Sequence, residues 1–162
     1  MTALRTWRPG TGSAWVSTAV RLVLGTVLLV AGVLKAVDPA GTVQAVRAYQ
    51  LLPAGVDTLV GWGQPFVEIA LGLLLVAGIA IRPVALATGL LLIILIAAVI
   101  SVAARGLRID CGCFGGGGPV PPGQTAYGRE ILRDVGLLML AIWLVVQPRS
   151  RLALDRTGKE ER

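Results

Sequence analysis

The stretch Leu22–Leu34, LVLGTVLLVAGVL, carries no charge and lies between Arg21 and Lys35. It forms the centre of an apolar block that runs from about residue 15 to residue 37. A helix needs roughly 20 apolar residues to cross the hydrocarbon core of a bilayer, so this block predicts a transmembrane helix. Basic residues precede it, but the apolar stretch is long and no small-x-small cleavage site is evident. We therefore expect an uncleaved signal anchor.

Three further apolar blocks follow along the chain. The second contains one interior charge, Glu68, and a very short turn at Arg82-Pro83 separates it from an uncharged third block. The fourth block is shorter, but Arg and Trp residues can anchor its ends at the membrane surface. The pattern predicts an all-α membrane protein, a four-transmembrane-helix bundle, with helices at about residues 15–37, 56–81, 83–104 and 129–147.

The composition supports lipid as the solvent of this chain. Its 162 residues suffice for one domain, and they are 55% hydrophobic and 15% charged, with a mean hydropathy of +0.77. The net charge of +6 comes from scattered residues and a basic C-terminal tail, which favours contacts with anionic head groups over nucleic acid. Histidine is absent, and this excludes Ser/His and Cys/His catalysis as well as histidine ligation of haem.

The distribution of Lys and Arg predicts the orientation of the bundle. With both termini cytoplasmic, as tails over residues 1–14 and 148–162, nine basic residues lie inside and six lie outside. The loops at about residues 38–55 and 105–128 then face the extracytoplasmic side. That side is oxidising in bacteria, so disulfides persist and exchange there. We expect a multi-pass protein of the bacterial cytoplasmic membrane.

Small residues in the first three apolar blocks predict close helix packing. Small faces let helices approach closely in lipid, where burial of apolar surface no longer drives association. Their spacing does not form a tight GxxxG motif, so it indicates a bundle and gives no indication of dimerisation. The small residues are Gly25, Gly32, Gly72, Gly78, Ala85 and Gly89.

Polar residues gather at the expected outer depth of the bundle. Lys35 ends the first block, Glu68 lies in the second, and Arg133 lies among the four charged residues that open the fourth. An intramembrane carboxylate needs a partner or a proton. Two interpretations stay open. Glu68 pairs with Lys35 or Arg133 to fix the helix packing, or all three form a polar site for a proton or a quinone-like head group.

The depth of Glu68 depends on where its helix begins. Proline is favoured in the first turn of a helix, so Pro65 allows a start near Gln64, with Glu68 in the opening turns. A start at Val56 instead places Glu68 about 18 Å along the helix, close to the middle of the membrane.

The two cysteines of the chain, Cys111 and Cys113, stand one residue apart in a glycine-rich loop. A disulfide requires Cα atoms about 4.4–6.8 Å apart, which the glycine between them permits only in a strained ring. Strained disulfides are labile. A disulfide that closes so short a loop also adds little to the stability of the fold. Arg105 and Arg108, if close, lower the pKa of a thiol. A redox-active pair is favoured over inert thiols.

A metal centre at the thiol pair is disfavoured by the rest of the sequence. Two thiolates supply half of a zinc or copper ligand set, histidine is absent, and the only other sulfur ligands are Met1 and Met139. We therefore predict no metal site.

Several segments together resemble the methylamine-utilisation MauE family, within the DoxX-like group of small membrane proteins. They are VLKAVDPAG, AYQLLP, QPFVEIALGLLLVAG and CGCFG, and the resemblance covers about residues 21–146. It implies extracytoplasmic thiol–disulfide chemistry. MauE is associated with maturing methylamine dehydrogenase, whose small subunit is rich in disulfides, and the broader group is tied to quinone reduction. By this resemblance, the positions that match the family's motif residues are Lys35, Asp38, Pro39, Glu68, Cys111 and Cys113.

These observations favour an integral membrane thiol–disulfide redox protein with Cys111 and Cys113 as catalytic residues. Its expected partners are extracytoplasmic thioredoxin-like proteins or maturing disulfide-containing proteins. Quinone is the candidate cofactor, at Lys35, Glu68 and Arg133. The alternative is a non-enzymatic assembly or chaperone subunit of a redox complex. A small-molecule transporter comes third, because the bundle is small and lacks repeats.

Overall fold

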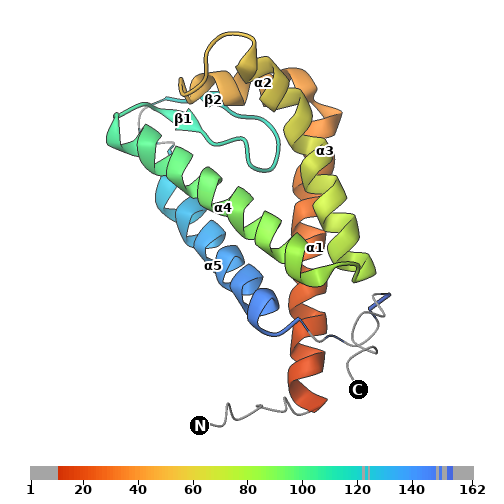
Figure 1. The fold of residues 1–162 in the computed structure, drawn as a ribbon. Helices are drawn as coiled ribbons and strands as arrows, with labels where there is room; N and C mark the ends of the chain where they lie inside the picture. The colour runs from red at the N-terminus through yellow and green to blue at the C-terminus, as the bar shows by residue number, and fades with distance from the viewer. Residues whose placement is uncertain (1–10, 122, 124, 149, 151–152, 155–162) are drawn as a thin grey trace, which may run out of the picture.

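The computed structural model describes residues 11–121, 123, 125–148, 150 and 153–154, and the described chain is helical apart from one small hairpin (Figure 1). Most of the two predicted tails lies outside these residues. The elements are α1 (Thr11–Val37), α2 (Pro39–Ala48), α3 (Val56–Ala77), α4 (Ile81–Ala104), β1 (Ile109–Asp110), β2 (Gly118–Pro119) and α5 (Tyr127–Val146).

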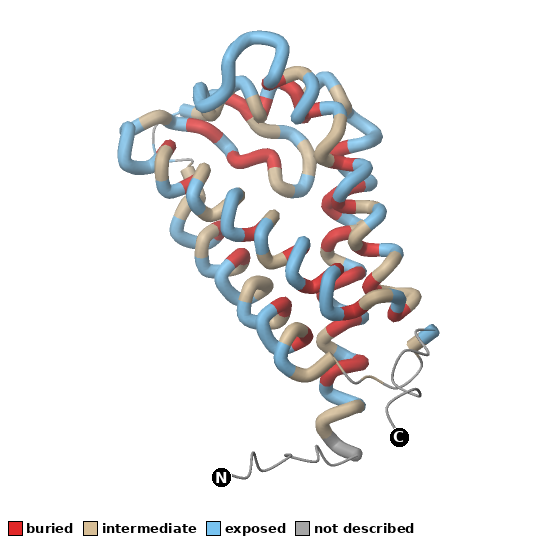
Figure 2. The backbone as a smooth tube through the Cα atoms, in the orientation of Figure 1, coloured by how far each residue is buried: buried red, intermediate tan, exposed pale blue. Residues whose placement is uncertain are grey.

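Within the described part of the chain, three helices are long and apolar enough to cross a membrane. They span Ser13–Val37, Val56–Ala77 and Ile81–Ala104, and they confirm three of the four predicted spans by length and composition. Helix α5 forms where the fourth was predicted, but charged residues fill its first two turns and lower its apolar content. Large apolar side chains are exposed along the helices, including Leu59 at 73% and Leu132 at 74% (Figure 2). Such surfaces fit a lipid environment.

The helices pack as two antiparallel pairs, α1 with α3 and α4 with α5. The predicted small residues account for the close approach of the first pair. A Cβ atom on Gly72 would lie 2.9 Å from the carbonyl oxygen of Gly25, and one on Gly32 would lie 2.8 Å from that of Pro65. The backbones of α1 and α3 therefore touch along much of their length.

The two pairs meet at one end of the bundle and diverge at the other (Figure 1). Buried residues at the closed end include Leu24, Leu75, Ile81 and Leu144, drawn from α1, α3, α4 and α5. Near that end the Ser17 hydroxyl donates a hydrogen bond of 2.9 Å to the carbonyl oxygen of residue 147, which ties α1 to the end of α5. At the open end, α2 and the β1–β2 hairpin lie across the helices.

The turn between α3 and α4 corrects the predicted helix ends. Gly78 adopts the left-handed conformation, with φ of 71°, and its N–H donates to the Leu75 carbonyl oxygen over 3.1 Å. This glycine terminates α3 at Ala77, before the predicted end at residue 81. Arg82 and Pro83 lie in the first turn of α4, where proline is well tolerated, and they do not form the turn.

The loop predicted at residues 38–55 contains a helix, α2, so this part of the prediction was wrong. Asp38 caps it by accepting a 2.9 Å hydrogen bond from the Gly41 N–H, and Pro39 occupies its first turn. Both are ordinary signals of a helix start. With ten residues α2 is too short to span a bilayer, so the pattern of long apolar blocks gives no indication of it.

Candidate functional site

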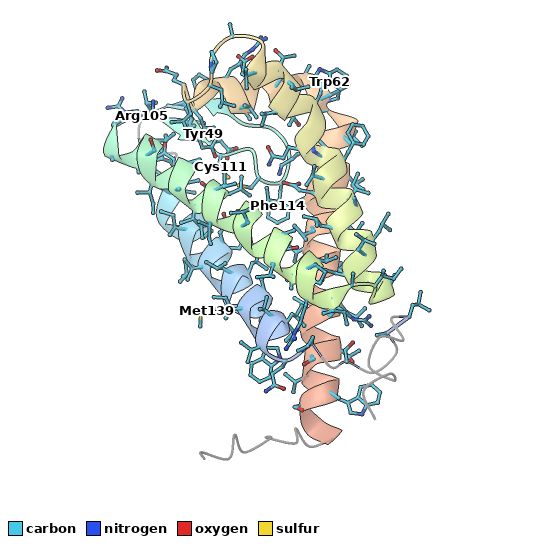
Figure 3. The ribbon with its side chains drawn as sticks, in the orientation of Figure 1. Tyr49, Trp62, Arg105, Cys111, Phe114 and Met139 are labelled. Carbon is cyan, nitrogen blue, oxygen red and sulfur yellow. The ribbon has the colours of Figure 1, made fainter. Side chains whose placement is uncertain are left out.

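The candidate site is the loop that joins β1 to β2 and contains both cysteines. The two strands pair antiparallel, with Asp110 opposite Gly118, and they close the loop at its base. The Tyr49 hydroxyl, just after α2, donates a 3.1 Å hydrogen bond to the Cys111 carbonyl oxygen. Figure 3 shows Tyr49 and Cys111 together at the open end of the bundle. The unpredicted helix α2 thus supports one side of the loop.

Glycine between the cysteines is required by the backbone and by the packing. Gly112 has a φ of 66°, and a Cβ atom there would lie 2.7 Å from the Cβ atom of Ala45 on α2. Only glycine satisfies both conditions without strain. The loop can therefore turn sharply at this residue, which brings the cysteines onto a single turn.

Both cysteines are free thiols in this structure, and they interact through the turn at Gly112. The Cys113 backbone N–H donates a hydrogen bond of 3.3 Å to the Cys111 sulfur. Cys111 is buried, whereas Cys113 is only partly buried. The sequence alone did not indicate which of the two thiols is the more accessible one.

The surroundings push the pKa values of the two thiols in opposite directions. A hydrogen bond from the Cys111 side chain lowers the pKa of Cys113, while burial and the Asp134 carboxylate oppose it and the positive charges of Arg133 and Lys35 add to it, so that the pKa is lowered on balance. That same hydrogen bond, together with burial, raises the pKa of Cys111. The less buried of the two cysteines is therefore the one whose pKa is lowered. This arrangement suits a nucleophile and its resolving partner.

Arg133, and not Arg105, is the arginine that acts on the thiols. Arg105 donates hydrogen bonds to the carbonyl oxygens of Tyr49 and Gln50 and so bridges the end of α4 to the end of α2. Arg133 lies over the Phe114 ring, 4.7 Å from its centroid, and is paired with a carboxylate of its own helix. Arg105 lies near the thiols in sequence but is held elsewhere by α2.

An Arg133→Gln variant is expected to slow iodoacetamide alkylation of Cys113 at neutral pH by about three- to tenfold, because one pKa unit changes the thiolate fraction tenfold. Arg133 lowers the pKa of Cys113, so its removal moves the alkylation profile toward higher pH. Peptide mass spectrometry across a pH series gives the rate at each cysteine. Arg129→Gln, at an exposed position of the same helix, is the matched control and should leave the profile unchanged. Equal profiles for both variants would contradict the role of Arg133.

A buried ion pair lies beneath the loop. The Lys35 ammonium contacts Glu68 Oε1 at 2.5 Å, and the two side chains are 4% and 2% exposed. The Gln64 amide donates a second hydrogen bond to the same oxygen over 2.9 Å. Helix α3 begins at Val56 and not near Gln64, so Glu68 lies about 18 Å along the helix. This is the deeper of the two positions that the sequence allowed.

The three residues of the predicted polar site belong to two different ion pairs. Of the two ion pairs considered, Lys35–Glu68 forms, while Arg133 is instead paired with its neighbour Asp134 at 2.9 Å. Lys35 faces a cavity beside the thiols, and Glu68 holds Lys35 in place.

The cavity next to the thiols has a volume of about 480 Å³ and lies between α3 and α4 beneath the cysteine loop. This is within the range of roughly 300–1,000 Å³ typical of small-molecule sites. Its walls are mostly apolar. The polar residues that line it are Lys35, Thr42, Tyr49, Gln64, Cys111 and Cys113. The sequence did not indicate this cavity, because it arises where the two helix pairs diverge.

Two carboxylates approach Cys111 and were not foreseen as its neighbours. Potential ligand atoms of Asp110, Cys111 and Glu130 lie within 4.8 Å of one another. One thiolate with two carboxylates does not complete a tetrahedral sulfur and nitrogen set. Met139 is 63% exposed and points away from Cys111 on the outer side of α5 (Figure 3). We assign no metal ligand here and regard Glu130 as a group able to exchange a proton with Cys111.

Comparison with known proteins gives one match. The family model described as "Methylamine utilisation protein MauE" matches residues 13–147, which cover most of the chain and both cysteines. No curated protein and no solved structure matches the chain.

Proposed function

Because this chain belongs to the methylamine utilisation protein MauE family, we propose that it is a membrane thiol–disulfide oxidoreductase that exchanges disulfides with an extracytoplasmic protein. One observation carries the proposal. The Cys113 N–H lies 3.3 Å from the Cys111 sulfur, so the thiols share one turn, outside the spanning segments. A thiol pair with divergent pKa values, one member of which is partly exposed, is typical of disulfide exchange and is unnecessary for a structural loop.

In the proposed topology α5 is the fourth membrane helix and both termini are cytoplasmic. Helix α5 runs antiparallel beside α4 and has 20 residues, which suffice to cross the bilayer core. With the N-terminus cytoplasmic, three spans precede the cysteine loop, so the loop lies on the extracytoplasmic side of a bacterial cytoplasmic membrane. A thioredoxin-like partner, or a maturing disulfide-containing protein, reaches the loop from that side.

In the proposed mechanism Cys113 is the exchanging sulfur and Cys111 is the resolving one. The Cys113 thiolate attacks the partner's disulfide, a Cys113–partner bond forms, and the partner's other sulfur leaves and takes up a proton. Cys111 then attacks Cys113 after passing its proton to Glu130, so the Cys111–Cys113 disulfide forms and the partner dithiol departs. The same steps in reverse oxidise the partner. Family membership makes a protein of methylamine utilisation the first partner to test.

A Cys111→Ser variant is expected to accumulate a mixed disulfide, because the exchanging thiol remains while its resolving thiol is gone. The probe is a thioredoxin-like protein reduced to its single attacking cysteine and activated with a chromogenic thiol reagent. Trapped complex is measured on non-reducing gels. The matched Cys113→Ser variant should trap at least about tenfold less, because the remaining thiol is buried and has a raised pKa.

Two outcomes contradict the proposed function. In the first, neither variant traps the probe. In the second, a Cys111→Ala/Cys113→Ala double variant supports normal disulfide formation in membranes. The second result would favour the non-enzymatic assembly subunit, in which the cysteine pair only shapes the loop.

A further inference from the structure

Cys111 has to lose its proton at a buried position. The residue is only 8% exposed, and the resolving step of the proposed mechanism requires its thiolate. The sequence contains no histidine to accept the proton. The Tyr49 hydroxyl donates its hydrogen to the Cys111 carbonyl oxygen, and a neutral phenol is too weak a base to take a proton from a thiol. A carboxylate is therefore the kind of group that is available to take it up.

Glu130, in the first turn of α5, is a buried carboxylate beside this sulfur. One of its oxygens, the Cys111 sulfur and an Asp110 oxygen lie within 4.8 Å of one another. Glu130 is itself 8% exposed, and its Oε2 atom has no hydrogen-bond partner in the described part of the chain. Glu130 therefore has an oxygen ready for a proton but little contact with the water that must finally receive it.

Asp110 connects this buried carboxylate to solvent. It is the last residue of β1 and is exposed, although its neighbour Cys111 is buried. A gap of up to 4.8 Å between two carboxylate oxygens is too long for a direct hydrogen bond, but one water molecule bridges such a distance. Proton transfer through one water is common in general acid–base chemistry. The three residues thus form a path from a buried sulfur to the surface.

The other charged groups around Glu130 do not offer such a path. Arg133 and Asp134 follow it on α5 and are paired with each other at 2.9 Å. Helix α4 packs against α5, but its one charged residue, Arg82, lies in its first turn, at the closed end of the bundle. The titratable and charged groups that act on Glu130 or respond to it are Tyr49, Asp110, Cys111, Arg133 and Asp134.

We propose that Glu130 and Asp110 form a proton relay between Cys111 and extracytoplasmic water, with Asp110 as its outlet. The inference rests on the proposed thiol–disulfide function and deepens its resolving step. Cys111 passes its proton to the Glu130 carboxylate, its sulfur attacks Cys113, the Cys111–Cys113 bond forms, and the partner's sulfur leaves as a thiolate. The proton on Glu130 then passes to Asp110 and on to water. In the reverse direction the two carboxyl groups return a proton to Cys111 as its sulfur leaves.

The probe is the chromogenic disulfide dithiobis(nitrobenzoate), mixed in a stopped-flow instrument with an excess of the reduced full-length protein in nanodiscs. Attack by Cys113 releases one thionitrobenzoate, and attack by Cys111 on the resulting mixed disulfide releases the second. The absorbance of the product therefore gives a separate rate for each thiol. Cys111→Ser should show the first release alone, which assigns the two phases.

An Asp110→Asn variant is expected to slow the second release by about tenfold at neutral pH without slowing the first. This is less than the hundredfold or more typical of a direct general base, because Glu130 keeps its place. The direction of the change is diagnostic. Removal of a negative charge beside Cys111 favours its thiolate, so a merely electrostatic role predicts a faster second release. Asparagine keeps an oxygen for the Gly112 N–H, which lies 3.5 Å from Asp110 Oδ1, so the loop retains this contact.

Asp38→Asn is the matched control, because it makes the same change at another exposed aspartate. Asp38 accepts a hydrogen bond from the Gly41 N–H at the start of α2, and asparagine caps a helix as well as aspartate does. Both releases should keep their wild-type rates. Asp110→Glu should restore the second release. Acetate should accelerate it in Asp110→Ala, whereas sodium chloride at the same ionic strength should not.

The trapping experiment with the thioredoxin-like probe separates failure of the relay from failure of the proposed function. Asp110→Asn combined with Cys111→Ser should trap that probe as Cys111→Ser does. Normal trapping together with an unchanged or faster second release in Asp110→Asn would overturn the relay and leave thiol exchange standing. A slower second release that neither Asp110→Glu nor acetate restores would identify a structural role and overturn the relay as well. A slower release that both restore, without any trapping, would support the relay and overturn exchange with a thioredoxin-like partner.

Discussion

A Glu68→Gln variant is expected to lose about 3–5 kcal/mol of the free energy of unfolding, the range measured when one partner of a buried ion pair is removed. The Lys35 ammonium and the Glu68 carboxylate are 4% and 2% exposed and in direct contact. Without the carboxylate, the ammonium is left in an apolar environment with no counter-charge. Water cannot replace the lost partner as it does at a surface.

Unfolding by SDS titration in mixed micelles, followed by tryptophan fluorescence, measures this loss. The Lys35→Met/Glu68→Gln double variant should recover most of it, because both charges are then gone. Arg47→Gln is the matched control. Its pair with Asp57 lies near the surface, with the arginine side chain 58% exposed, so its loss should be below about 1 kcal/mol. Equal losses for Glu68→Gln and Arg47→Gln would show that the buried pair contributes no more than a surface pair.

That Glu68 needs a cation could be predicted from the sequence because the physical constraint is severe, but Lys35 and Arg133 both stayed open as its partner. A carboxylate deep in a long apolar block must find a cation, and few cations lie at the same depth. The depth itself could not be fixed, because Pro65 is compatible with a helix start nearby and with a position inside the helix. The structure places Pro65 inside α3, so Glu68 occupies the deeper of the two positions.

The three long apolar helices followed from composition, but some of their ends and the surroundings of the thiols did not. Tyr49, Glu130 and Arg133 reach the cysteines from elements that are distant in sequence, and no periodicity encodes such contacts. Arg105 was the natural candidate by proximity in sequence, yet it donates its hydrogen bonds to the carbonyl oxygens of Tyr49 and Gln50, just after α2. The capping signals of α2 at Asp38 and Pro39 were present, so this helix could have been predicted from them.

The cavity was beyond prediction because it depends on the angle between two helix pairs. Apolar residues on α3 and α4 read equally well as a packed interface or as a lipid-facing surface. Only the packing distinguishes these, since α1 holds α3 and α5 holds α4 while the pairs diverge under the loop. The apolar pattern of α3 and α4 therefore does not indicate the cavity.

A Gly72→Leu variant is expected to lose about 3 kcal/mol or more of the free energy of unfolding, at the upper end of what overpacking costs. A Cβ atom on Gly72 would lie 2.9 Å from the Gly25 carbonyl oxygen and 3.0 Å from the Leu29 backbone nitrogen. Both are backbone atoms of α1, so no side-chain rotation relieves the contact and the helices must separate. SDS titration, as for Glu68→Gln, measures the loss, and Gly136→Leu on α5 should change it by less than about 1 kcal/mol, as expected away from such contacts.

The consequence of Gly72→Leu extends to the polar site, because the same contact sets the register of α1 against α3. Gly32 lies against the Pro65 carbonyl oxygen, one turn before Glu68, so a displaced α1 carries Lys35 away from its partner. Lys35→Met/Glu68→Gln should therefore lose less stability when Gly72→Leu is added than the wild type does, a non-additivity expected of coupled sites. Strict additivity would show that the glycine contact and the ion pair act independently, and that the α1–α3 approach does not position Lys35.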